Sequence, residues 1–296
     1  MPLERLAPAK VNLFLHVAPL RADGFHPLCS LVTFADVGDL LRLDADAAMN
    51  FRIEGPFGAG LPTDADNLIV RARDAALTVL AGAPRTFALT LDKRLPIASG
   101  VGGGSADAAA ALRLIQGAVG RAPTPDEAQR LAEIAETLGS DVPMCLAGRP
   151  SIAEGRGEIL SPPPVFPDLD AVLVNCGVAS PTGPVYRAYD AAGAPGGDER
   201  PAWPPVLASV QEVAAFLATT RNDLEPPAVA LAPPIGETLD LLKSRDETLF
   251  ARMSGSGATC FALCADPAAR DSLARSVSAL RPDWWVKPCR LAGFAT

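Results

Sequence analysis

The chain has 296 residues, of which 49% are hydrophobic and 20% charged, as is typical of a folded globular protein. Its net charge of −8 argues against a broad basic surface, so we expect no nucleic acid partner. The apolar run 11–18 is too short for a membrane span and lacks a cleavage site. Six cysteines without a C-x-x-C pair, and only two histidines, predict a reduced cytoplasmic protein without a metal site.

In the first half of the chain, predicted strands and helices surround a glycine-rich loop. Period-two alternation and β-branched residues predict strands over 5–17, 28–36, 39–44 and 86–91. A helix is expected over 67–80, capped by the polar residues 63–66, and the run 105–116 after the loop contains strong helix formers. Thr124 and Glu127 form a capping box, and the helix that they begin should end at Gly139, with a short helix possible after it.

The second half begins after a proline-rich stretch at 161–167, which predicts a boundary between two domains, 1–160 and 161–296. The expected elements are strands over 171–175, 259–263 and 284–287 and helices over 206–219, 235–244 and 266–280. The Gly- and Pro-rich segment 191–205 is expected to be a loop. Because both halves mix helices and strands, the predicted fold class is α+β.

The loop from Pro96 to Ala106 carries the strongest chemical signal. Its four glycines within five positions allow positive φ angles and a close backbone approach to a ligand. Its amides and the start of the following helix predict an anion site, for which phosphate is the natural guest. The loop fits neither the Walker A motif, which needs a lysine, nor the dinucleotide fingerprint G-x-G-x-x-G. A flexible turn is the alternative interpretation.

Three further features are candidate site elements. The Gly-Ser-Gly turn within 253–259 predicts a hairpin by itself, but with the first loop it could close over an anionic ligand. Lys10 lies in an apolar strand and Asp141 follows a helix end. Such residues can serve as electrostatic partner and base in phosphoryl transfer, or as a surface lysine and a helix cap. His26 is either a solvated turn residue or a partner for a base or sugar, and His16 is expected to be structural.

Eight short motifs are spread along nearly the whole chain, at 7–13 (APAKVNL), 21–26 (RADGFH), 66–68, 96–106, 138–143 (LGSDVP), 153–158 (AEGRGE), 221–225 (RNDLE) and 253–259. Together they resemble the motifs of the GHMP kinases, named for galactokinase, homoserine kinase, mevalonate kinase and phosphomevalonate kinase. The stretches 21–26 and 153–158 resemble the members that act on a cytidyl-linked alcohol in the non-mevalonate isoprenoid pathway. This resemblance implies a ribosomal S5 domain 2-like N-terminal domain and a ferredoxin-like C-terminal domain.

The resemblance also implies a role for each matching residue. Lys10 and Asp141 would be the catalytic pair, with Asp141 as the base. The substrate would be bound by Asn12, Phe25, His26, Tyr186, Gly255 and Gly257, with aromatic rings against the cytosine. The ATP site would consist of Asn67 and Leu68 beside the adenine and, around the phosphates, Pro96, Ile97, Ala98, Ser99, Gly100, Val101, Gly102, Gly103, Gly104, Ser105 and Ala106.

The activity that the resemblance implies is ATP-dependent phosphorylation of a small-molecule hydroxyl by a monomer or homodimer, with Mg²⁺ bound mainly through nucleotide phosphates. Two positions depart from the family pattern. Phe25 stands where the family often has tyrosine, and Ala98-Ser99 replaces a more glycine-rich loop start. The rival interpretations are a kinase for homoserine or mevalonate and a nucleotide-binding module without catalysis.

Overall fold

The computed structural model describes residues 3–294, which form two compact units that interleave along the chain. Unit 1 contains the chain up to Ala9, Val37–Leu95 and Gly102–Gly148. Unit 2 contains Lys10–Asp36, Pro96–Val101 and the chain from Arg149 onward. Two long strands, β1 (Leu3–Val17) and β2 (Leu28–Asp44), pass from one unit to the other. The division at 160/161 follows the linear sequence rather than these units and stays a prediction.

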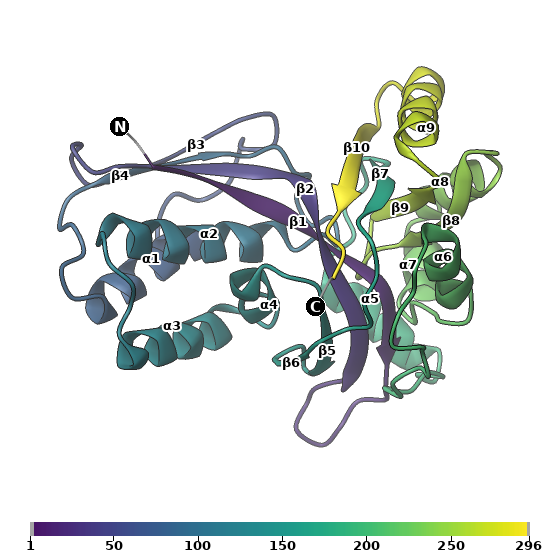
Figure 1. Cartoon of the computed structure of the whole chain (residues 1–296), viewed down its shortest axis with the longest axis horizontal. Helices are drawn as coiled ribbons and strands as arrows, with labels where there is room; N and C mark the ends of the chain where they lie inside the picture. The colour runs from purple at the N-terminus through teal and green to yellow at the C-terminus, as the bar shows by residue number, and fades with distance from the viewer. Residues whose placement is uncertain (1–2, 295–296) are drawn as a thin grey trace. The chain divides into compact units, whose positions relative to one another are not determined.

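Unit 1 is a layer of helices beneath a small sheet (Figure 1). In the sheet, β4 (Ala88–Asp92) pairs antiparallel with β2, where Leu91 faces Leu41, and parallel with β3 (Asn50–Glu54). The helices are α1 (Leu68–Val79), α2 (Gly103–Ala118), α3 (Pro125–Leu138) and the short α4 (Val142–Ala147). Buried alanines along α2 allow α1 and α4 to pack closely against it.

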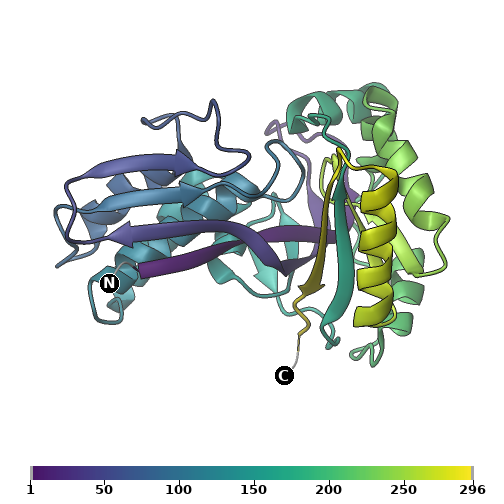
Figure 2. The same ribbon diagram turned by 90° about the horizontal axis from the view of Figure 1, so that it is seen from above.

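Unit 2 is built on the antiparallel strands β7 (Leu169–Asn175), β8 (Thr248–Met253), β9 (Thr259–Cys264) and β10 (Trp285–Leu291), in the spatial order β10-β7-β9-β8. Between β7 and β8 the chain forms α5 (Thr182–Ala191), α6 (Val210–Ala218), α7 (Glu225–Leu231) and α8 (Pro234–Lys243). Helix α9 (Pro267–Leu280) joins β9 to β10 and lies along β10 and β7 (Figure 2). The last of these four strands, β10, thus lies beside the first, β7, and helices occupy the connections from β7 to β8 and from β9 to β10. This is the ferredoxin-like arrangement.

The remaining strands of unit 2 are β5 (Ser151–Gly155) and β6 (Ile159–Ser161), and β5 pairs with the first part of β2. The core beneath β7 and β9 contains Val172, Val174, Cys260 and Leu273, all fully buried. Each such aliphatic side chain contributes about 1.5–3 kcal/mol when it leaves water. All six cysteines lie within the described part of the chain as free thiols, and five of them are buried.

The predicted fold class, α+β, is confirmed, and most predicted elements are present within a few residues. Helix α1 begins at Leu68, and its cap is the side chain of Asn67 rather than a residue of 63–66. The helix predicted from 206 begins only at Val210, after the cap Ser209, because Val206 makes a β-bridge with Val165. Helices α5 and α7 were not predicted from the sequence, because their first turns contain proline, which is unfavourable within helices but tolerated at their starts.

Candidate active site

The glycine loop crosses from unit 2 to unit 1 between Val101 and Gly102. Gly100 (φ 74°) and Gly102 (φ 64°) take the left-handed conformation that favours glycine. Gly102 is the N-cap of α2, so the helix begins at Gly103, two residues earlier than the predicted run 105–116. Its cap has no side chain to accept the first amides. The exposed start of this 16-residue helix is therefore suited to an anion.

In unit 2, the first half of the loop is bound to the turn between β8 and β9. The Ser254 hydroxyl donates to the carbonyl oxygen of Gly100 (3.0 Å), and the Thr259 amide donates to that of Ser99 (3.0 Å). A Cβ atom on Gly100 would lie only 2.4 Å from the Ser254 carbonyl oxygen and 2.7 Å from the Gly257 nitrogen. Residues 254–258 are the hairpin connection that the sequence predicts. They also lie against residues 99 and 100 of the glycine loop, and closure of the two turns over an anionic ligand stays a prediction.

Lys10 and Asn12 lie in β1, next to this pair of turns. Lys10 is 4% exposed, so the alternative of a surface lysine is wrong. Its ammonium donates to Asn12 Oδ1 (2.7 Å), and its backbone amide donates to the carbonyl oxygen of Val101 (2.9 Å). The backbone amide of Asn12 donates to Ser254 Oγ (3.1 Å). A Cβ atom on Gly255 would lie 2.9 Å from the Gly100 carbonyl oxygen and 3.3 Å from Asn12 Oδ1. A buried ammonium, an amide and two glycine turns therefore share one region of unit 2.

Asp141 is half-buried in unit 1, at the N-cap position of α4. Its side chain makes no capping hydrogen bond to that helix, so the alternative of a helix-capping aspartate does not explain the residue. Asn67, by contrast, caps α1, since its Oδ1 accepts a hydrogen bond from the Ile69 amide (2.9 Å). Leu68 Cδ1 lies 3.8 Å from the place a Cβ on Gly104 would take, which puts Leu68 beside the first turn of α2.

The three residues expected to bind the cytosine are in unit 2. The ring of His26 lies 4.9 Å from the ring of Tyr186 on α5, and its Nδ1 donates to the carbonyl oxygen of Ala18 (2.9 Å). Its Nε2 faces Asp190 Oδ1 at 3.4 Å. Phe25 is 47% exposed and carries the guanidinium of Arg156 over its ring (3.7 Å). His26 is therefore a packed and hydrogen-bonded residue, and the alternative of a solvated turn histidine is wrong.

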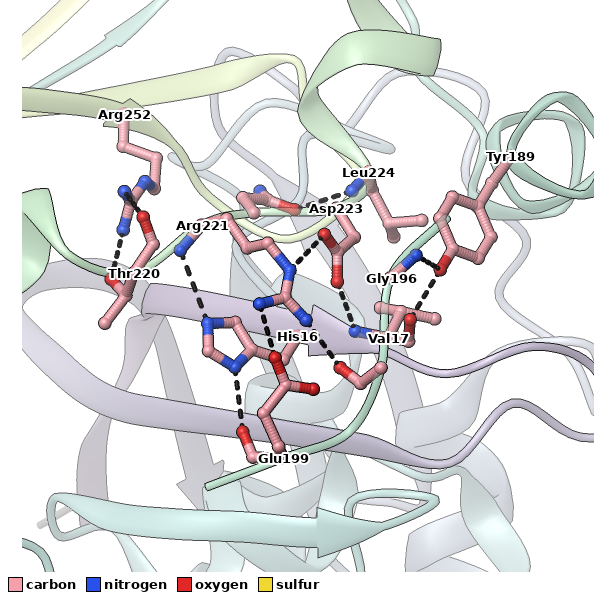
Figure 3. Close-up of polar contacts among 12 residues, drawn as sticks. His16, Val17, Tyr189, Gly196, Glu199, Thr220, Arg221, Asp223, Leu224 and Arg252 are labelled. Atoms are coloured by element: carbon pink, nitrogen blue, oxygen red, sulfur yellow. Dashed lines mark hydrogen bonds and ion pairs between the residues drawn. The ribbon is translucent and has the colours of Figure 1, made fainter. Parts of the chain in front are cut away.

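The motif 221–225 holds the Gly- and Pro-rich segment against β1 (Figure 3). The Arg221 guanidinium donates to Asp223 Oδ1 (2.6 Å), Glu199 Oε1 (2.7 Å) and the Gly197 carbonyl oxygen (2.8 Å). His16 is buried between them, donating from Nδ1 to the Glu199 carbonyl oxygen (2.9 Å) and accepting the Arg221 amide at Nε2 (3.3 Å). Burial lowers the pKa of His16, which favours this neutral form. The predicted structural role of His16 agrees with these contacts.

Unit 1 contains a buried charged cluster that was not predicted from the sequence. Lys93, just after β4, donates to Asp39 Oδ2 (2.5 Å) and to Asp107 Oδ2 (2.7 Å). All three side chains are at most 5% exposed. The available signal was a lysine directly before the loop and an aspartate among alanines directly after it. Asp39 is distant in the sequence, so its part in the cluster had no local signal.

Residues 3–294 contain neither a cluster suited to a metal ion nor a helix suited to cross a membrane. No group of three or more His, Cys, Asp or Glu side chains is placed to hold a metal ion. None of the helices in this part of the chain combines the length and the apolar character that a membrane crossing requires.

Two family models match the chain: the GHMP kinases N terminal domain over residues 67–149 and the GHMP kinases C terminal domain over residues 207–283. A 4-diphosphocytidyl-2-C-methyl-D-erythritol kinase from Caulobacter sp. (strain K31) is 56% identical over 294 residues, covering 99% of both chains. The enzyme of the same name from Caulobacter vibrioides (strain NA1000 / CB15N) is 53% identical, over 99% of this chain and all of the relative.

Solved structures agree with these matches. A crystal structure of 4-(cytidine 5'-diphospho)-2C-methyl-D-erythritol kinase superposes with a TM-score of 0.76 at 34% identity, covering 99% of this chain and 100% of the other. A homoserine kinase from Cytophaga hutchinsonii superposes with a TM-score of 0.67 at 20% identity, which shows a shared fold only. The chain therefore belongs to the GHMP kinase family, among its 4-diphosphocytidyl-2-C-methyl-D-erythritol kinases.

Proposed function

We propose that this enzyme transfers the γ-phosphoryl group of ATP to the 2-hydroxyl of 4-diphosphocytidyl-2-C-methyl-D-erythritol, a step of the non-mevalonate isoprenoid precursor pathway. The observation that carries the proposal is the region of unit 2 where Lys10, Asn12, the glycine loop and the 254–258 turn lie together. The activity for which relatives are named, at 53–56% identity along their whole length, supports the same substrate.

In the proposed reaction, Asp141 accepts the proton of the substrate hydroxyl as its oxygen attacks the γ-phosphorus, and ADP leaves. The ammonium of Lys10 stabilises the negative charge that spreads over the transferred group. Burial strengthens this interaction, because a low-dielectric surrounding screens the charge less than water does. Asn12 is proposed to orient the alcohol, since its Oδ1 binds the same ammonium.

The ATP phosphates are proposed to bind along residues 96–106. The left-handed glycines and the start of α2 provide amides without intruding Cβ atoms, so the cradle fits a polyphosphate. Mg²⁺ would neutralise phosphate charge, and it commonly keeps waters and phosphate oxygens as ligands, so it needs no cage of carboxylates. Ser105, in the first turn of α2, is the protein side chain proposed to approach it.

The cytosine is proposed to bind at Phe25 and His26, with Tyr186 contributing through its contact with the His26 ring. Phe25 retains an exposed ring that can stack on a base but lacks the hydroxyl of the tyrosine common in the family. We propose that the enzyme acts in the cytoplasm, as a monomer or homodimer and without nucleic acid.

The proposal is tested by measuring ADP release with purified enzyme, ATP and Mg²⁺, using the cytidyl substrate, mevalonate and homoserine in parallel. We expect turnover with the cytidyl substrate alone. The Asp141→Asn variant should lose about 10²–10⁴-fold in kcat, the usual contribution of a general base. Turnover with mevalonate or homoserine instead would overturn the substrate assignment, and an unchanged kcat in Asp141→Asn would remove that residue from the role of base.

A further inference from the structure

The buried cluster of Lys93, Asp39 and Asp107 connects three separate elements of unit 1. Asp39 lies in β2 and is fully buried, Lys93 follows β4, and Asp107 lies near the start of α2. The Lys93 ammonium binds one carboxylate oxygen of each aspartate, at 2.5 and 2.7 Å. Removing one partner from such a group leaves a buried charge without compensation. The three residues therefore hold their elements in one arrangement.

These contacts fix the chain on both sides of the glycine loop. Before the loop, Asp39 Oδ1 accepts the amides of Arg94 (2.6 Å) and Leu95 (2.8 Å). After the loop, Asp107 ties the first turns of α2 to Lys93. The Lys93 ammonium also lies 3.0 Å from the place a Cβ on Gly103 would take, directly against the first residue of α2. The chain just before the segment 96–102 and the helix just after it are thus both tied to this cluster.

The cluster contains two aspartates and one lysine. Burial raises the pKa of Asp107 to about 8 despite the nearby ammonium of Lys93, and the charge of Asp39 acts in the same direction. Asp107 Oδ1 is buried and has no hydrogen-bond partner within the described residues. This unpartnered oxygen and the raised pKa both show that Asp107 lies in a poorly solvated place at the first turns of α2.

We propose that Lys93, Asp39 and Asp107 are positioning residues for ATP, which hold the two ends of the glycine loop at the separation that the phosphates require. This inference rests on the proposed ATP site at residues 96–106. The three side chains are proposed to act without touching the nucleotide. They act through the amides of Leu95 and the first turn of α2.

The test compares four proteins: the unmodified enzyme, Lys93→Met, the triple variant Lys93→Met/Asp39→Asn/Asp107→Leu, and Arg121→Met. Arg121→Met is the matched control, because it breaks the Arg121–Glu127 ion pair of the same unit at a distance from the loop sequence. The triple variant replaces every charge by a neutral side chain, and the amide oxygen introduced by Asp39→Asn can still accept the two backbone amides. For each protein, KM for ATP, KM for the cytidyl substrate, kcat and the thermal midpoint are measured.

We expect Lys93→Met to lower the thermal midpoint and to raise KM for ATP by about tenfold, because small displacements of positioning groups are costly. KM for the cytidyl substrate should change by less than about twofold. The triple variant should recover the thermal midpoint, since neutral replacement of a buried ion group is often harmless, but it should keep the raised KM for ATP. Arg121→Met should leave both KM values unchanged.

Two results would overturn the inference. One is a triple variant in which the thermal midpoint and KM for ATP recover together, because the cluster would then serve stability alone. The other is a rise of both KM values in equal proportion, which would indicate general loss of structure. If the unmodified enzyme released no ADP with any substrate, the proposed function would fail instead, and direct nucleotide titration of the same variants would still test the positioning of the loop.

Discussion

The two sides of the glycine loop are held by different chemistry. In unit 2, residues 98–100 accept neutral hydrogen bonds from Ser180, Ser254 and Thr259. In unit 1, the flanks of the loop are held by the buried charges of the Lys93 cluster. A neutral hydrogen bond contributes about 0.5–1.5 kcal/mol net, whereas breaking a buried ion group costs about 3–5 kcal/mol. We therefore expect added volume to disturb the unit 2 side most and lost charge to disturb the unit 1 side most.

The largest effect on the unit 2 side is expected for Gly100→Ala. Its Cβ would lie 2.4 Å from a backbone oxygen, at a φ of 74° that alanine rarely adopts. Strain and overpacking together should lower the free energy of unfolding by at least about 2 kcal/mol. Gly120→Ala is the matched control, with the same φ of 74° and open space around it. Equal losses in the two variants, measured by urea denaturation, would show that the close approach to the 254–258 turn is unimportant.

On the unit 1 side, Gly103→Ala is expected to lower the free energy of unfolding by about 1–3 kcal/mol, as overpacking does. The new methyl group would lie 3.0 Å from the Lys93 ammonium. This ammonium can move away only by breaking a hydrogen bond to Asp39 or Asp107. Gly104→Ala places its methyl group in a roomy position in the same turn, with Leu68 Cδ1 at 3.8 Å. Thermal midpoints that are equally low in both variants would contradict the special position of Gly103.

Ser254→Ala should lower the free energy of unfolding by about 1–3 kcal/mol, because two buried backbone groups lose their hydrogen-bond partner. The Ser254 hydroxyl accepts a hydrogen bond from the backbone amide of Asn12 and donates one to the Gly100 carbonyl oxygen. Ser276→Ala is the control: its half-buried hydroxyl donates to the Leu273 carbonyl oxygen within the same helix, α9, so its loss should cost less than the loss of Ser254, about 0.5–1 kcal/mol. Equal losses of unfolding free energy in the two variants, measured by denaturation, would show that the two hydrogen bonds of Ser254 are unimportant for stability.

The smallest effect expected is a pH dependence that arises from His16, away from both sides of the loop. Because its folded-state pKa lies below the ordinary value of 6.5, the unfolded chain binds a proton first as the pH falls. Stability is then unaffected above pH 6.5 and decreases below it, until the folded state is also protonated. The charged groups around the ring are Glu199, Arg221 and Asp223. In His16→Gln, the loss of stability between pH 6.5 and 5.5 should be smaller than in the unmodified enzyme, and an identical loss would contradict the assignment.

The glycine loop and the hairpin turn could be predicted from sequence because their signals are local. Closely spaced glycines, a strand before them and a helix-forming run after them all lie within about 30 residues of chain. The ferredoxin-like arrangement followed from the family resemblance. The two units did not follow from composition, because the chain crosses between them within strands and within the loop itself, where no proline-rich linker marks the change.

The charged cluster and the contacts of Arg221 with Gly197 and Glu199 could not be predicted, because their members are far apart in sequence. Asp39 and Lys93 meet only after β2 pairs with β4, and Arg221 meets Glu199 only after the 191–205 segment returns to β1. Lys10 illustrates the same limit. A lysine in an apolar strand predicts either a surface or a buried residue, and the contacts with Asn12 and Val101 decide between them.

Phosphoryl transfer to the cytidyl substrate can be followed with a labelled phosphate. ATP labelled at the γ-phosphate is incubated with the unmodified enzyme, Mg²⁺ and 4-diphosphocytidyl-2-C-methyl-D-erythritol, and the products are separated and identified by phosphorus NMR. We expect the label in a monophosphate ester at the 2-hydroxyl of the erythritol part, in equal amount to the ADP formed. Label found only as inorganic phosphate, or ATP bound but unchanged, would contradict the proposed reaction.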